Sequence, residues 1–212
     1  MKKLLSLILC LTVFAVQAQK DPQAMRILDA MSKKYKSYET YKADFTYSLI
    51  NDVEDIRDDF SGSILVKGDQ YKLDLGNQVI YNNGETVWTY LPEVNEVNIS
   101  NANEGQMEMS PSTIYTVYKK GFKVVYYNST TISGKKYHLI DLIPEDRREK
   151  PYWVRLSIQD GTNDLKSYTI SEDSGNKYVY DIKSFKPNAS ASSSEFAFNK
   201  SKYPGVEIID LR

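Results

Sequence analysis

The spacing of hydrophobic positions changes early in the chain. Between residues 24 and 38, apolar side chains recur every three or four residues, and Asp21-Pro22 supplies an N-cap followed by proline at the first helical position. This pattern predicts one amphipathic helix that ends near Lys36. From Phe45 onward, apolar residues alternate with polar ones, which is the two-residue period of strands with one buried face.

The clearest local signal is a hairpin, in which residues 78–81 and 86–91 flank an Asn82-Asn83-Gly84 turn. Further strand-like segments follow at 123–127, 136–143, 153–158, 165–171, 177–185 and 195–198. This periodicity predicts roughly nine to eleven strands along the chain. Acidic clusters interrupt the pattern and are interpreted as solvated loops: Asp52, Glu54, Asp55, Asp58 and Asp59, and Glu145 with Asp146.

A second, shorter helical pattern lies in the middle of the chain. Ser110-Pro111 opens it, and Ile114, Val117, Tyr118 and Phe122 form its apolar stripe. We expect this segment to be a lid helix over a cavity. The predicted fold class is therefore mainly β with an α lid: an unclosed antiparallel β-barrel, meaning a strongly curved sheet, covered by short helices. Two packed sheets are the alternative.

Residues 1–18 have the features of a signal peptide. Lys2 and Lys3 precede an apolar run over residues 4–16, and Val16-Gln17-Ala18 offers small residues for cleavage. Cys10 lies inside the apolar run and follows Leu9, which argues against lipid attachment. We expect an exported chain in which residues 19–212 form one domain without cysteine.

Composition excludes several kinds of chemistry. The net charge of −1 argues against nucleic-acid binding. His138 is the only histidine, so Ser-His-Asp and Cys-His sites and the usual zinc sites are nearly excluded, and we expect it to have a structural role. No P-loop, dinucleotide-binding or EF-hand motif is present. We expect no catalytic residue, metal or cofactor, although a pair of carboxylates in a hydrolase is not ruled out by composition.

Several motifs occur in an order that resembles one family. They are Tyr41-Lys42-Ala43-Asp44-Phe45-Thr46, Gly62-Ser63-Ile64-Leu65-Val66-Lys67, the hairpin Asn83-Gly84-Glu85-Thr86-Val87-Trp88-Thr89-Tyr90-Leu91-Pro92, Asp141-Leu142-Ile143-Pro144, and Phe196-Ala197-Phe198 before Pro204-Gly205-Val206. Together they resemble the periplasmic outer-membrane lipoprotein carrier proteins, the LolA family. The hairpin is the most specific of these motifs.

The resemblance implies a periplasmic, non-enzymatic carrier that acts as a monomer. Its cargo would be the acyl chains of lipoproteins, released by an ATP-driven transporter of the inner membrane and passed to a possible outer-membrane acceptor. A lipoprotein needs such a carrier because each exposed methylene costs about 0.8 kcal/mol in water. The alternatives are a sensor of lipids or lipoproteins with the same fold, and the lipidated outer-membrane acceptor.

The resemblance also implies roles for individual residues. The acyl-chain cavity would be lined by Phe45, Tyr47, Ile64, Val66, Tyr71, Leu73, Leu75, Trp88 and Tyr90. The same surface is also what an ordinary hydrophobic core would show. Many family members hold the lid closed with an arginine just after the Val-Lys motif, but here Gly68-Asp69 follows Val66-Lys67. Lys67 is the nearest candidate for a latch, although an ammonium does not replace a guanidinium that donates several hydrogen bonds.

Overall fold

The computed structural model describes residues 20–102, 112–146 and 151–212. Its one α-helix, α1 (Pro22–Lys36), begins as predicted at Asp21, whose carboxylate accepts hydrogen bonds from the N–H groups of Gln23 (2.8 Å) and Ala24 (3.0 Å). Three lysines occupy its last turn, where positive charge complements the helix dipole. The predicted signal peptide lies outside the described residues and stays a prediction.

Twelve strands form one sheet in the described part of the chain. They are β1 (Thr40–Asn51), β2 (Ile56–Lys67), β3 (Gln70–Asp74), β4 (Val79–Asn82), β5 (Thr86–Leu91), β6 (Glu96–Asn101), β7 (Phe122–Ile132), β8 (Lys135–Pro144), β9 (Trp153–Gln159), β10 (Leu165–Ser171), β11 (Lys177–Pro187) and β12 (Glu207–Asp210). Their order is β12-β6-β5-β4-β3-β2-β1-β11-β10-β9-β8-β7. Every neighbouring pair is antiparallel except β12 and β6. Because β12 and β7 do not pair, the sheet is open, which confirms the predicted unclosed barrel.

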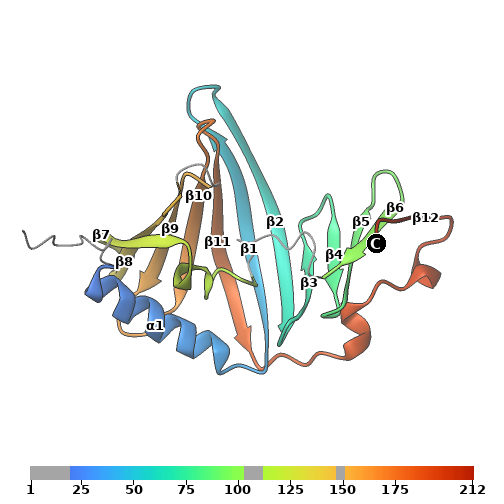
Figure 1. Ribbon diagram of the computed structural model, residues 1–212, viewed down its shortest axis with the longest axis horizontal. Coiled ribbons are helices and arrows are strands. Elements are labelled where there is room, and N and C mark those ends of the chain that lie inside the picture. Colours follow the sequence, from blue (N-terminus) through green and yellow to red (C-terminus); the bar gives the residue numbers. More distant parts are fainter. Residues whose placement is uncertain (1–19, 103–111, 147–150) are drawn as a thin grey trace, which may run out of the picture.

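The sheet is strongly curved (Figure 1), and a large hydrophobic core lies against one of its faces. Helix α1 runs along one end of the strands on the β7–β11 side and packs Ala24, Leu28, Met31 and Tyr35 into this core. Every second side chain of the strands points to the same side of the sheet, and strand residues on this side pack with these helix residues in the same core. We call the sheet surface that faces this core the inner face.

A second cluster lies on the opposite, outer face of the sheet. Tyr81, Tyr90 and Val97 pack there against Val206 and Tyr203 from the C-terminal segment. The hydroxyl groups of Tyr81 and Tyr203 are 2.9 Å apart, within hydrogen-bonding distance. The segment after β11, with the 3₁₀ turns η2 (Ser193–Phe196) and η3 (Lys200–Lys202), thus crosses to the outer face before β12 joins β6.

The predicted lid helix is wrong as an element of secondary structure. Residues 112–116 form turns, η1 (Val117–Lys119) is a single 3₁₀ turn, and Phe122 already begins β7. β-Branched residues at Thr113, Ile114, Thr116 and Val117 restrict their side-chain rotamers and disfavour a helix. Ser110 and Pro111 lie outside the described residues.

Two further expectations are corrected. Asp58 and Asp59 belong to strand β2 and not to a loop, since β1 and β2 continue as a long exposed hairpin in which the hydroxyl of Ser48 donates a hydrogen bond to Asp59. Residues 195–198 are not a strand, because Ser192 and Glu195 form a capping box that starts the turn η2. No helix among the described residues is long and apolar enough to cross a membrane.

Candidate functional site

The candidate site is the inner face between β1, β2 and β3, together with the segment that covers it. Cross-strand pairing places Ile64 between Ala43 on β1 and Leu73 on β3, and all three side chains are buried. Seven residues predicted to line a cavity share the main core: Phe45, Tyr47, Ile64, Val66, Tyr71, Leu73 and Leu75. The structure therefore brings most of the predicted surface together.

Trp88 and Tyr90 do not join this group. They belong to the cluster on the outer face, whereas Val87, their neighbour on β5, packs in the main core. Successive residues of a strand point to opposite sides, so the burial of Val87 sends Trp88 outward. The expectation that the hairpin aromatics share one surface with Leu73 is thus corrected.

Residues 112–119, which we call the cover segment, lie over the inner face without being helical. Ile114, Tyr115 and Tyr118 are buried, with 1%, 5% and 0% of their surfaces exposed. Tyr118 donates a hydrogen bond to Asp29 of α1 at 2.7 Å, and burial raises the pKa of Tyr118 to about 12. The two predicted lid residues Ile114 and Tyr118 therefore cover the core, while Val117 is only partly buried against it.

Tyr115 is the central contact of the cover segment, and no pattern along the chain singled it out. Its ring stacks on Tyr35 of α1 with centroids 3.7 Å apart and planes at 16°, and it meets Tyr41 edge-on at 6.0 Å. Burial raises the pKa of Tyr115 well above its ordinary value, so the ring stays neutral. Tyr35 lies on the apolar stripe of α1, whereas Tyr115 lies off the predicted stripe of its segment, so only the tertiary structure pairs them.

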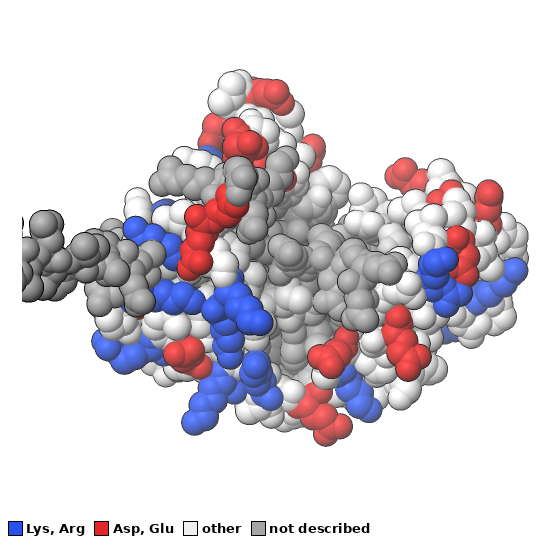
Figure 2. Space-filling model, in the orientation of Figure 1, with Lys and Arg blue, Asp and Glu red and all other residues white. Residues whose placement is uncertain are grey.

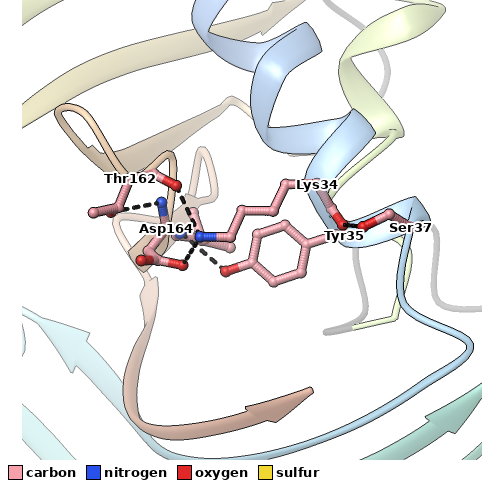
Figure 3. A network of polar contacts seen from close by, with 6 residues as sticks. Lys34, Tyr35, Ser37, Thr162 and Asp164 are labelled. Carbon is pink, nitrogen blue, oxygen red and sulfur yellow. Dashed lines mark hydrogen bonds and ion pairs between the residues drawn. The ribbon is translucent and has the colours of Figure 1, made fainter. Parts of the chain in front are cut away.

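A polar network fixes Tyr35 (Figure 3). Its hydroxyl accepts a hydrogen bond from the backbone N–H of Leu165 at 3.1 Å. Next to it, Lys34 Nζ donates to the carbonyl oxygen of Thr162 (2.8 Å) and forms an ion pair with Asp164 (2.6 Å). The C-terminal end of α1 is thus tied to the β9–β10 turn, which holds one side of the tyrosine stack in place.

Two spaces flank Tyr115. The first, which we call the mouth, is a hollow of about 410 Å³ lined by Tyr35, Lys36, Tyr38, Tyr41, Val66, Gly68, Asp69, Ser112, Thr113, Tyr115 and Thr116. The second, the inner pocket, has only about 10 Å³ and is lined by Ala43, Phe45, Ile64, Ile114, Tyr115, Tyr168, Tyr180 and Ile182. A space of that size barely holds one water molecule. Tyr115 contributes to both walls and so separates them.

The remaining predicted residues do not add chemistry to this site. Strand alternation points Lys67 to the outer face, and its side chain forms no hydrogen bond or ion pair with any residue the structure describes, so the latch stays a prediction. His138 Nδ1 lies 2.9 Å from the hydroxyl of Tyr126, and Nε2 lies 3.2 Å from Asp160. Over residues 20–102, 112–146 and 151–212, no group of side chains is arranged to hold a metal ion.

Comparison with known proteins identifies a family for this chain. The sequence profile described as outer membrane lipoprotein carrier protein LolA matches residues 12–175. No curated protein matches the chain by sequence.

Solved structures resemble the chain at low sequence identity. An uncharacterised conserved protein from Thermus thermophilus is 11% identical, with a TM-score of 0.59 over 89% of this chain and 99% of the other. The Mycobacterium tuberculosis lipoprotein LppX is 12% identical, with a TM-score of 0.52 over 82% and 100%. A LolA superfamily protein from Nitrosomonas europaea is 13% identical, with a TM-score of 0.45 over 82% and 97%. At these identities the likeness to the first two shows a shared fold.

Proposed function

Because the chain belongs to the outer membrane lipoprotein carrier protein family LolA, we propose that it is an exported, non-catalytic carrier of lipoproteins in the periplasm. The acyl chains of the cargo would occupy the inner face beneath the cover segment. An inner-membrane ATP-driven transporter would load it, and an outer-membrane acceptor would unload it. A periplasmic sensor of lipids or lipoproteins with the same fold is the alternative.

The observation that carries this proposal is the position of Tyr115 between the mouth and the inner pocket. Tyr115 lines both spaces, so movement of its ring would widen the connection from the surface toward the apolar inner face. The cover segment contains turns and a single 3₁₀ turn, so its movement breaks no ladder of strand hydrogen bonds and no α-helix. The inner face beyond it is built from aromatic and aliphatic side chains suited to acyl chains.

The nearly filled inner pocket also supports reversible binding. An acyl chain gains about 0.8 kcal/mol for each buried methylene. It would have to displace Ile114 and Tyr115, whose own burial stabilises the closed form. The lost contacts of the cover segment offset part of the gain, so the net affinity is lower than burial alone would give. A carrier needs this balance in order to release its cargo.

Exposing spheroplasts to the purified, exported protein tests the proposal. We expect newly made lipoproteins to leave the membrane as soluble complexes with the carrier. A photo-crosslinking aromatic amino acid at Tyr180, on the inner face, should capture the lipoprotein. The same amino acid at Trp88, on the outer face of the sheet, is the matched control and should capture none.

Equal crosslinking from Tyr180 and Trp88 would place the cargo elsewhere and overturn the site. If lipoproteins stay on the membrane while the protein still binds acylated peptides in detergent, the sensor interpretation replaces the carrier. The photo-crosslinking residue is bulkier than the tyrosine it replaces, and overpacking a core costs about 1–3 kcal/mol, so circular dichroism of both variants establishes that they are folded before crosslinking.

A further inference from the structure

A basic hollow lies beside the mouth, at the C-terminal end of α1. It has a volume of about 360 Å³ and is lined by Asp29, Ser32, Lys33, Lys36, Ser37, Tyr118 and Lys119. Lys20 adds a fourth ammonium at its edge, since its Nζ donates hydrogen bonds to the carbonyl oxygens of Tyr118 (3.3 Å) and Lys119 (3.1 Å). Lys36 lines both this hollow and the mouth, so the two share a border.

The charges of this region are not neutralised within the described structure. Lys33, Lys36 and Lys119 form no ion pair with any described carboxylate, in contrast to Lys34, which is paired with Asp164. Two carboxylates are present, Asp29 in the hollow and Asp69 at the mouth. Among these six side chains, the four lysines outnumber the two carboxylates by two positive charges. Figure 2 shows basic side chains gathered at the lower left, over α1 and the chain beside it, whereas acidic ones occupy the upper tip.

An aromatic ring, Tyr38, lines the mouth close to Lys36, which the mouth shares with the basic hollow. Tyr38 is half-buried there and packs against Tyr35 and Phe185 with ring centroids 6.1 and 5.7 Å apart. Tyrosine rings favour the boundary between water and lipid because they have an apolar body and a polar end. Lysines with flexible stems next to such rings are typical of surfaces that lie on anionic membranes.

We propose that this surface, formed by Lys20, Lys33, Lys36, Lys119 and Tyr38, docks the protein on an anionic lipid bilayer. Docking would turn the mouth toward the lipid, so that acyl chains enter without crossing water. The lysines would attract the negatively charged head groups without a fixed stereochemistry, which suits the shallow, open arrangement of point charges. The part played by the mouth rests on the proposed carrier function, whereas the docking itself does not.

Sedimentation with lipid vesicles tests the docking. We expect the protein to bind vesicles of phosphatidylglycerol and phosphatidylcholine but not vesicles of phosphatidylcholine alone, and to dissociate as salt is raised. Reversing the charge of Lys33, Lys36 and Lys119 with glutamate should weaken binding at least about a hundredfold, because loss of the attraction of each lysine alone costs roughly fivefold. The vesicles contain no lipoprotein, so the result is independent of carrier activity.

A matched triple variant controls for net charge. It carries the same three glutamate substitutions at exposed lysines of the β7–β8 turn and the C-terminal segment, which do not line the hollow or the mouth: Lys135, Lys200 and Lys202. We expect this control to keep most of the binding. Equal loss in both variants would show attraction by net charge alone, and equal binding of the wild type to neutral and anionic vesicles would show no electrostatic docking. Either outcome overturns the proposal.

Discussion

Phe45 and Gly62 pair directly across β1 and β2, and the phenyl ring covers the glycine. A Cβ atom at Gly62 would lie 2.5 Å from Cε2 of Phe45 and 3.0 Å from the carbonyl oxygen of Asp74. The ring is buried and lines the inner pocket. Glycine is therefore the residue that lets this aromatic side chain lie close to the sheet on the inner face.

We expect Gly62→Ala to destabilise the protein by about 1–3 kcal/mol, because the new methyl group forces Phe45 out of its place in the core. In the Gly62→Ala background, Phe45→Leu should cost less than it does in the wild type, since the shorter side chain leaves room. Urea denaturation of the four proteins measures this coupling. Additive effects of the two substitutions would contradict the packing described here.

Tyr115 gives a prediction about access to the inner face. Tyr115→Ala removes a buried ring and should cost about 3–5 kcal/mol of stability, as large-to-small core substitutions do. Because Tyr115 lines both the mouth and the inner pocket, we expect its removal to widen the way between them, so that a fluorescent fatty acid binds faster in stopped-flow fluorescence. Tyr115→Phe keeps the stack on Tyr35 and serves as the control. An unchanged association rate in Tyr115→Ala would mean that acyl chains enter by another route.

The ion pair between Lys34 and Asp164 should contribute little to stability. The two side chains are 28% and 44% exposed, and water screens such pairs. A double-mutant cycle with Lys34→Met and Asp164→Asn should give a coupling of about 0.5–1 kcal/mol that decreases with added salt. A coupling several times larger would show that the network acts as a rigid anchor for α1.

Buried tyrosines predict a loss of stability in alkali. Burial raises the pKa of Tyr180 to about 12, and burial together with Asp29 raises that of Tyr118 to about 12, from an ordinary value of 10.0. Above about pH 10 the unfolded chain releases these protons while the folded chain keeps them. The free energy of unfolding therefore falls as the pH rises from about 10 to 12.

Urea denaturation at a series of pH values checks this decline, with tyrosinate absorbance as a parallel measurement. Tyr180→Phe removes one of the titrating groups, so its stability should depend less steeply on pH in this range. An equally steep decline in Tyr180→Phe would assign the loss to other groups.

Local patterns along the chain determined much of the fold. Helix α1, its start at Asp21, the hairpin around Gly84 and the open antiparallel sheet all follow from periodicity and turn residues, which depend on neighbours in sequence. The order of the motifs also indicated the family. The middle of the chain misled the same reasoning, since the stripe from Ile114 to Phe122 fits a helix but is divided between turns, η1 and β7.

Only the tertiary structure decided which face each aromatic residue occupies and where the inner face is closed. Alternation on β5 identifies two faces but not which of them meets the main core, and the C-terminal segment settles this by covering Tyr90 and Trp88. The stack of Tyr35 on Tyr115 joins residues 80 positions apart. Such contacts depend on how the curved sheet brings distant segments together, and this information is absent from any short stretch of sequence.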